Sequence, residues 1–244
     1  MKPTMMVCPH DTAKNPGRWY FLAQYAAMSG YPIHLEISLD FVDFHEQLGN
    51  ADLVYANPQD ALRLINDRGF SAIARSSGIY DEVVFIANHK IINPSLKSLD
   101  GQALATVTSL IPTSIGLSVL DREGIRPSEI KSADTWLMVF DLVRSGQVAY
   151  GFMYKDTYNG LSEDNRKSVN AFYVSAERQV FHSMCIGPTV AEHKEQWQQA
   201  LLSMHTNADG KMALEELGFE KWLPVLDNEV EGIQKLVTLY SERI

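Results

Sequence analysis

Short apolar runs alternate with amphipathic segments along almost the whole chain, and this alternation limits the fold more than any other feature. Period-two or continuously apolar runs predict strands at 4–8, 33–39, 52–56, 103–107 and 148–154. Segments with a helical period, several of them ending at glycine, predict helices at 18–28, 42–48, 58–65, 113–123, 136–144, 191–204, 211–217 and 230–241. Strands that alternate with helices indicate an α/β protein.

Two places break this alternation, because strand-like runs follow each other there without a helix between them. They are 71–75 with 83–88, and 169–174 with 180–186. Paired extended segments of this kind are what a two-lobed protein with two crossover strands as its hinge requires. We therefore predict one discontinuous lobe of residues 1–86 and 182–244 and a second lobe of 87–181. A ligand is expected between the lobes, at the carboxyl ends of the strands.

Composition excludes some classes of protein. The 244 residues carry a net charge of −9, so a nucleic-acid surface is not expected. The two cysteines, Cys8 and Cys185, lie far apart in apolar contexts without a CxxC motif. They are expected to be buried thiols rather than a disulfide.

The lengths of the apolar runs and the first residues of the chain are used to predict its localisation. No apolar run is long enough to cross a bilayer. The start, MKPTMMVCPHD, lacks the apolar region of a signal peptide. The chain as written is therefore expected to be cytoplasmic, or periplasmic if a leader has been removed from it.

The stretch TSLIPTSIG at 108–116 places hydroxyl side chains around a proline, directly before a predicted helix. Threonine and serine at a helix start can simply cap it. The same hydroxyls and unpaired N–H groups can instead hold an anion, which the helix dipole favours. The sequence leaves both roles open for Thr113 and Ser114.

Other candidate ligand contacts lie in loops that follow predicted strands. They are His10, Asn57, Tyr80, Tyr154 and Asp156. Asn57 before Pro58 also fits a helix cap. A turn at Gly78 can direct Tyr80 toward a ligand, or it can be a surface turn in which the neighbouring Asp81 is simply solvated. His10 with Asp11 could support acid–base chemistry, but no GxSxG or CxxC nucleophile motif accompanies the pair. We expect that pair at the rim of the site.

Two further segments are assigned structural roles. His182, in FHSMCIG, is expected to be a buried or hinge histidine rather than a ligand. Residues 205–216 match a calcium loop in part, but His205 occupies the position that most requires Asp. We expect a connection between helices there, with Asp209 near a helix start, and no metal.

The order of several stretches resembles the phosphate/phosphonate-binding proteins of ABC transporters, which have the type 2 periplasmic-binding-protein fold. The stretches are ADLVYANPQDALRLINDRGFSAIAR, IYDEVVFIAN, SLKSLDGQALA, TSLIPTSIG and LVRSGQVAYGF. The resemblance extends from Met6 to about Glu220. It implies two lobes, joined by two crossover strands, that close on an oxyanion.

The resemblance also implies site residues. The family's hydroxyl run maps onto Pro112, Thr113 and Ser114, a crossover tyrosine onto Tyr80, and a polar residue of the first lobe onto Tyr55 or Asn57. Pro112 replaces an expected serine and so removes a hydroxyl and an N–H together. Trp136 stands where the family has a ligand histidine. These departures favour a carboxylate, a less charged anion or a partly aromatic ligand over phosphonate itself.

Together these observations predict a monomeric solute-binding protein without a cofactor. Its partners would be a small anionic ligand and either an ABC-transporter permease or a signalling protein. The alternative is a small cytoplasmic enzyme on the same fold, with His10, Asp11 or Asp156 as its titratable group.

Overall fold

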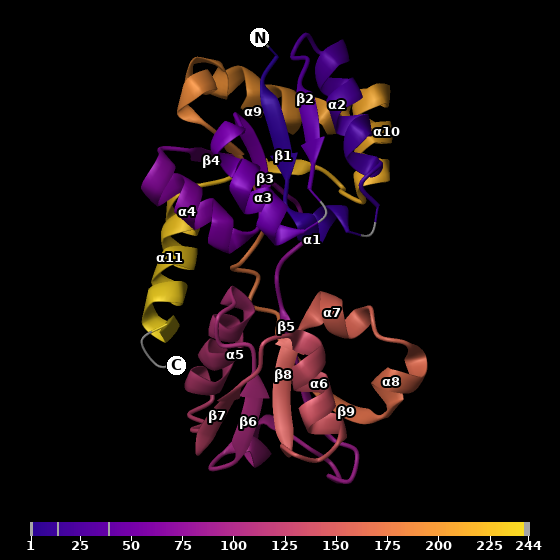
Figure 1. Cartoon of the computed structure of the whole chain (residues 1–244), viewed down its shortest axis with the longest axis vertical. Coiled ribbons are helices and arrows are strands. Elements are labelled where there is room, and N and C mark those ends of the chain that lie inside the picture. Colours follow the sequence, from indigo (N-terminus) through magenta and orange to yellow (C-terminus); the bar gives the residue numbers. More distant parts are fainter. Residues whose placement is uncertain (1, 14, 39, 242–244) are drawn as a thin grey trace. The chain divides into compact units, whose positions relative to one another are not determined.

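The computed structural model describes residues 2–13, 15–38 and 40–241 (Figure 1). The chain forms two compact units, one of Met1–Ile79 with Phe181–Val230 and the other of Tyr80–Val180 with Glu231–Ile244. We call them unit 1 and unit 2. Each contains one mixed sheet, which confirms the predicted two-lobed α/β class. The lobe boundaries predicted from the sequence differ from these units at 80–86, at Phe181 and at 231–244, and they stay a prediction about the ligand-binding lobes.

Unit 1 is built on a six-stranded sheet of order β11-β4-β10-β3-β1-β2. The strands are β1 (Thr4–Val7), β2 (His34–Ile37), β3 (Leu53–Ala56), β4 (Ser71–Ser76), β10 (Ser183–Ile186) and β11 (Trp222–Pro224). Strand β1 runs parallel to β2 and β3, whereas β10 lies antiparallel between β3 and β4. The predicted strand 33–39 is confirmed over His34–Ile37, and Leu39 lies outside the described residues.

The helices of unit 1 cover this sheet, and Figure 1 shows α2 and α10 side by side. The helices are α1 (Pro9–Thr12), α2 (Arg18–Met28), α3 (Phe41–Gln47), α4 (Pro58–Arg68), α9 (Lys194–Ser203) and α10 (Ala208–Leu217), with 3-10 turns at Leu48–Asn50, Pro188–His193 and Met204–Thr206. The partial calcium motif falls on the last turn and α10, which Asn207 caps, so it is the expected connection between helices.

Unit 2 has a five-stranded sheet of order β7-β6-β8-β5-β9. Its strands are β5 (Val83–Asn88), β6 (Ala103–Thr106), β7 (Glu129–Ser132), β8 (Tyr150–Tyr154) and β9 (Val169–Val174). Its helices are α5 (Ile111–Arg122), α6 (Trp136–Arg144), α7 (Lys155–Asn159) and α8 (Glu163–Lys167), with a 3-10 turn at Leu96–Leu99. Helix α11 (Asp227–Ser241) begins in unit 1 and ends in unit 2.

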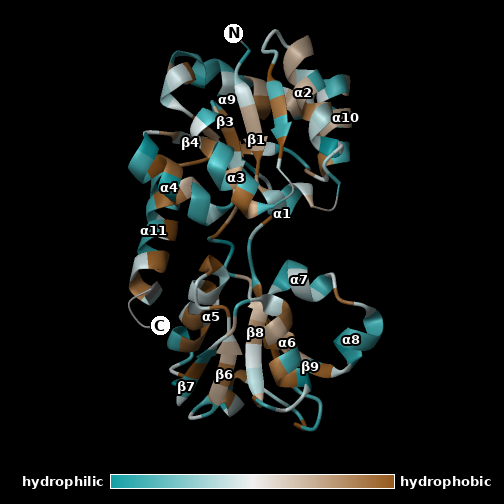
Figure 2. Ribbon diagram, viewed as in Figure 1, coloured by the Kyte–Doolittle hydropathy of each residue, from teal (hydrophilic) through white to brown (hydrophobic). Residues whose placement is uncertain are grey.

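Burial follows the apolar runs that predicted the strands. Figure 2 shows hydrophobic residues along strands such as β3, whereas the short helix α8 is hydrophilic. In unit 1 the side chains of Trp19, Tyr55 and Trp222 are almost fully buried. In unit 2, α5 approaches β8 so closely that a Cβ at Gly116 would lie 2.4 Å from the ring of Phe152. Gly116 is therefore required by packing.

The chain changes sheets where the sequence predicted crossovers. It leaves unit 1 after β4 and enters unit 2 at β5, then returns between β9 and β10. The two strands of each predicted pair thus belong to different sheets. Among the described residues, no helix is both long enough and apolar enough to span a membrane.

Candidate functional site

In unit 1, three segments bring polar side chains to one edge of the sheet. Cys8 and the short helix α1 follow β1, and Asn57 follows β3. Because β10 runs antiparallel to β3 and pairs Ser183 with Ala56, His182 reaches the same edge. The carboxyl ends of parallel strands are where α/β proteins commonly bind ligands.

Asp11 and His182 form the central contact of this edge. His182 Nδ1 lies 2.7 Å from Asp11 Oδ2, and both side chains are almost buried. The ring of His10 is centred 5.5 Å from that of His182. The guanidinium of Arg18 donates from Nη2 to the Asp11 carbonyl at 2.9 Å and lies 3.9 Å from Asp11 Oδ1. The pair predicted at the rim is thus half-buried and joined to a residue 171 positions away.

The surroundings of Asp11 favour its charged form. Burial alone raises the pKa of a carboxyl, because it removes water from the charge. The charge and hydrogen bond of His182, together with His10 and Arg18, outweigh that cost. The pKa of Asp11 therefore lies below its ordinary value of 3.8.

Cys8 adds a sulfur to the same cluster. Its Sγ accepts a hydrogen bond from Asn57 Nδ2 at 3.3 Å. Burial, with a smaller contribution from the charge of Asp11, raises the pKa of Cys8 to about 12, so the group is a neutral thiol near pH 7. Cys8 and Cys185 are both free and buried, as the sequence predicted.

Asn57 caps helix α4. Its Oδ1 accepts from the Asp60 N–H at 3.0 Å and its Nδ2 donates to Asp60 Oδ2 at 2.6 Å. The capping role is therefore confirmed, and ligand binding by Asn57 stays a prediction. Tyr55 belongs to the aromatic core, with its ring centred 4.7 Å from Trp19 and 5.9 Å from His182. Its side chain is 1% exposed, so it supports the edge from within.

In unit 2, the corresponding feature is the loop after β6 together with the first turn of α5, residues 107–114, here called the hydroxyl loop. Thr113 is fully buried within it. Its Oγ1 donates to the carbonyl of Val107 at 2.6 Å and lies 2.9 Å from Thr106 Oγ1. The Thr113 hydroxyl thus holds the loop together from inside, a role the sequence did not predict.

Some hydrogen-bond donors of the hydroxyl loop have protein partners and others do not. Thr108 Oγ1 lies 2.6 Å from Ser132 Oγ, at the end of β7. The Thr113 N–H donates to Leu110 O, and Pro112 has no N–H. In the part of the chain that the structure describes, no protein acceptor is found for the N–H groups of Ser109 and Ile111. The Ser114 hydroxyl, near the start of α5, likewise has no hydrogen-bond partner among those residues.

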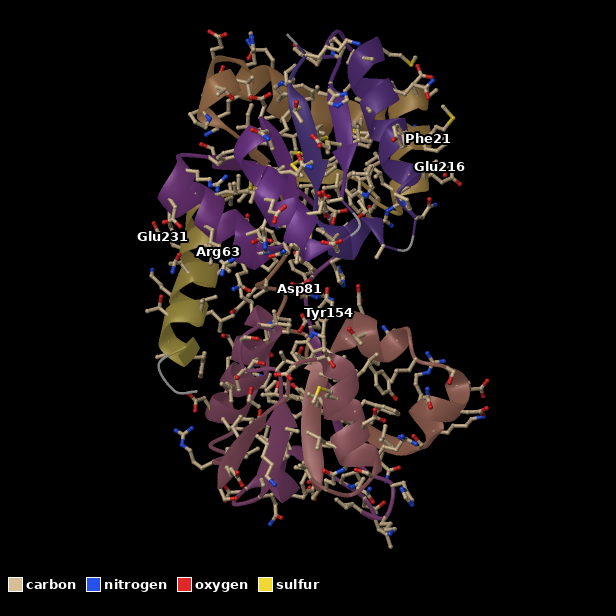
Figure 3. The ribbon with its side chains drawn as sticks, in the orientation of Figure 1. Phe21, Arg63, Asp81, Tyr154, Glu216 and Glu231 are labelled. Carbon is tan, nitrogen blue, oxygen red and sulfur yellow. The ribbon has the colours of Figure 1, made fainter. Side chains whose placement is uncertain are left out.

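A second polar contact in unit 2 joins β8 to the segment before β5. Tyr154, the last residue of β8, donates from its hydroxyl to Asp81 Oδ1 at 2.9 Å, and both side chains are buried (Figure 3). The Asp81 N–H donates to Val180 O, which joins the two connecting segments of the chain. Tyr80 is half-buried beside them.

The remaining candidates follow β7 and β8. Trp136 is the first residue of α6, half-buried against a core cluster that includes Val139. Leu137 and Met138, which follow it, are exposed. Asp156 is exposed in the first turn of α7. Asp156 follows a predicted strand, whereas the strand before Trp136 was not predicted, and the ligand contacts of both residues stay a prediction.

The most developed contact of unit 1 was not predicted from the sequence. His10 was predicted to contact the ligand, whereas Asp11 was expected only at the rim and His182 in a buried or hinge role. The only local signal was the position of Asp11 directly after a buried strand. Asp81 was likewise considered only as the neighbour of Tyr80.

Comparisons with known proteins agree with this architecture. Residues 12–230 match the family model described as "ABC transporter, phosphonate, periplasmic substrate-binding protein". A search of curated proteins finds no match.

Several solved structures share the fold at low sequence identity. A Xanthomonas citri protein bound to chloride ion superimposes with a TM-score of 0.72 at 14% identity, covering 99% of each chain. PhnD1 from Prochlorococcus marinus, in complex with methylphosphonate, has a TM-score of 0.70 at 14% identity over 98% of each chain. The periplasmic aliphatic sulphonate binding protein SsuA from Escherichia coli has a TM-score of 0.70 at 11% identity, covering 99% of this chain and 92% of that one.

The family match decides between the two functions that the sequence left open. The matched family consists of substrate-binding proteins, so the binding function is confirmed over the enzyme alternative. The match covers most of the chain and agrees with the resemblance carried by the ADLVYANP and TSLIPTSIG stretches. The chain therefore belongs to the family of periplasmic substrate-binding proteins of phosphonate ABC transporters.

Proposed function

We propose that this protein reversibly captures a small oxyanion, of the phosphonate, sulfonate or carboxylate class, for an ABC transporter. Family membership supports the transport role over ligand sensing. The hydroxyl loop is the observation that supports an anion as the ligand, because the N–H groups of Ser109 and Ile111 have no protein acceptor among the described residues. Unpaired N–H groups at a helix start, with the positive end of the helix dipole, favour negative charge.

Within this proposal, Thr113 and Ser114 have different tasks. Thr113 fixes the shape of the loop through its buried bonds to Val107 and Thr106. Ser114 donates its hydroxyl to an oxygen of the ligand. Pro112 lowers the number of donors, which favours a singly charged anion over a doubly charged phosphonate.

Under this proposal each unit by itself holds candidate polar contacts for such an anion. Unit 1 supplies imidazole N–H donors from His10 and His182, with Asp11 orienting His182. Unit 2 adds Tyr80, Tyr154 and Asp156 as polar neighbours of the bound molecule. The exposed side chains of Leu137 and Met138, beside Trp136, favour a ligand with an apolar substituent.

The test is a thermal-shift screen followed by calorimetry, with inorganic phosphate, methylphosphonate, ethanesulfonate, acetate and benzoate as probes. A ligand that binds only the folded protein raises the melting temperature. We expect one oxyanion class to do so.

The matched pair of variants is Ser114→Ala and Ser118→Ala. Ser118 lies one turn further along α5 and donates its hydroxyl to Ile115 O within the helix. Losing one hydrogen bond of about 1 kcal/mol weakens binding roughly fivefold, so Ser114→Ala should raise the Kd of the oxyanion by about that factor. Ser118→Ala should leave the Kd unchanged. Equal affinity in both variants and wild type would overturn the role of Ser114, and a screen without any stabilising anion would overturn the proposed function.

A further inference from the structure

The edge of unit 1 holds three different metal-ligating side chains. The Sγ of Cys8, a carboxylate oxygen of Asp11 and a ring nitrogen of His182 all lie within 4.8 Å of one another. They come from two distant parts of the chain, after β1 and before β10. The proposed anion binding does not use Cys8, and it gives Asp11 only an orienting part.

We infer that Cys8, Asp11 and His182 form a binding site for a thiophilic divalent cation such as Zn²⁺. Sulfur, imidazole nitrogen and carboxylate oxygen are the ligands that Zn²⁺ takes in proteins, usually four in a tetrahedron. Mg²⁺ and Ca²⁺ are not expected, because both prefer oxygen ligands only. Three protein ligands would leave the fourth position to water or to another small ligand.

The spacing of the three side chains fits such a cation after a small movement. With Zn–N and Zn–O distances of about 2.1 Å and a Zn–S distance of about 2.3 Å, ligand atoms in a tetrahedron lie about 3.5 Å apart. Asp11 Oδ2 and His182 Nδ1 are 2.7 Å apart. Replacing the proton between them by a cation therefore moves the two atoms apart by less than about 1 Å. Cys8 needs a similar adjustment, from within 4.8 Å.

The charges around the site act in both directions. The carboxylate of Asp11 favours a cation, because it is a hard oxygen ligand that brings negative charge to the site. The guanidinium of Arg18, 3.9 Å from Asp11 Oδ1, opposes one. Cys8 must lose its proton and its hydrogen bond from Asn57, and Nδ1 of His182 must be unprotonated to bind. His10 is a neighbour of His182 and not a ligand, and a proton on its ring would oppose the cation. Binding should therefore release a proton, and the affinity should increase as the pH rises.

The decisive measurement is a titration of the metal-free, reduced protein with Co²⁺, a spectroscopic substitute for Zn²⁺. A Cys8 thiolate bound to Co²⁺ produces a near-ultraviolet charge-transfer band, and Zn²⁺ should abolish the band by displacing Co²⁺. The matched variants are Cys8→Ser and Cys185→Ser. Cys185 is the second buried thiol, on β10, and its sulfur contacts Ser183 instead of the cluster.

We expect the band in wild type and in Cys185→Ser, and its loss in Cys8→Ser. His182→Gln keeps the thiol and should weaken Co²⁺ binding at least tenfold. If Cys8→Ser does not fold, His182→Gln and a competition of wild type against a chromophoric Zn²⁺ chelator carry the test. No band in wild type, an unchanged band in Cys8→Ser, or unchanged Co²⁺ affinity in His182→Gln would each overturn the site.

This test is separate from the test of the proposed function. The oxyanion titrations are carried out with EDTA-treated protein, so they report on the hydroxyl loop without metal. If an oxyanion binds but Co²⁺ produces no band, only the cation site fails. If Co²⁺ binds through Cys8 but no oxyanion stabilises the protein, only the proposed function fails.

Discussion

The two candidate binding regions both place polar groups after the ends of strands, but the groups differ in their chemistry. The edge of unit 1 gathers ionisable side chains, Cys8, His10, Asp11 and His182, which contact one another. The hydroxyl loop of unit 2 contains no ionisable side chain at all. It relies on hydroxyls and backbone N–H groups, held in place by the buried Thr113. Charge in unit 1 can therefore change with pH, whereas the dipoles of the hydroxyl loop cannot.

The charges of unit 1 and the hydroxyls of the hydroxyl loop can be changed separately. A protonation event at Asp11 alters the hydrogen bonding of His182 without changing any group of the hydroxyl loop. Conversely, removing a hydroxyl from the loop leaves the charges of unit 1 unchanged. Variants in each region should thus separate electrostatic effects from those of fixed dipoles.

The largest effect is expected for Asp11→Asn. It removes the charged partner of His182 and Arg18 in a nearly buried setting, and breaking such a pair typically costs about 3 kcal/mol of unfolding free energy. Urea denaturation followed by circular dichroism measures this loss. The control is Asp156→Asn at an exposed carboxyl, which should change stability by less than about 0.5 kcal/mol. Equal stability of the two variants would show that the unit 1 cluster is not held by charge.

The next effect is expected for Tyr154→Phe in unit 2. The change removes the hydroxyl that donates to the buried Asp81 carboxylate, and a hydrogen bond to a charged group is worth about 2 kcal/mol. The control is Tyr158→Phe on the partly buried α7, which should lose much less unfolding free energy. Should both variants unfold at the same urea concentration as wild type, the Asp81 contact does not stabilise unit 2.

A smaller effect is expected for Thr113→Val. Valine keeps the shape of the side chain but cannot donate to Val107 O, so about 1 kcal/mol should be lost. Thr113→Ser retains the hydroxyl and serves as the control for that hydrogen bond. Because Thr113 shapes the loop, Thr113→Val should also weaken oxyanion binding in calorimetry. Unchanged stability and affinity in Thr113→Val would contradict the internal role of this residue.

The smallest effect is expected on acidification. Since the pKa of Asp11 is lower in the folded protein than its ordinary 3.8, Asp11 adds stability above that pH, and this contribution is lost as the pH falls through the folded value. Protonation of Asp11 stays partial until the pH lies below the folded pKa, so the loss down to pH 2 is gradual. Urea midpoints between pH 6 and pH 2 should fall more steeply in wild type than in Asp11→Asn. Parallel curves would mean that the pKa of Asp11 is not lowered.

Most of the fold could be predicted from the sequence, because its strands and helices carry clear apolar periods. The missed elements lack that signal. Strand β7 is the short polar run EIKS at a sheet edge, and β11 has three residues ending in a proline. Helix α1 has a single turn that begins with Pro9. Such elements form because neighbouring strands or loops position them, not because of local propensity.

The site was predicted less completely, for a different reason. Asn57 as a helix cap could be predicted from its position before Pro58. The contact between Asp11 and His182 could not, because it depends on β10 entering the sheet between β3 and β4. The sequence also could not show that the Thr113 side chain points inward, because a hydroxyl at a helix start can face either way.

The position of β10 has a consequence for the order in which the protein can fold during synthesis. All five strands of the unit 2 sheet lie within residues 83–174, so they have all left the ribosome before β10 does. Unit 1 must wait until residue 186 has emerged, because β3 and β4 pair with β10 and not with each other. A nascent chain arrested so that β9 but not β10 has left the ribosome should therefore hold a protease-resistant unit 2 sheet while the strands of unit 1 are still digested.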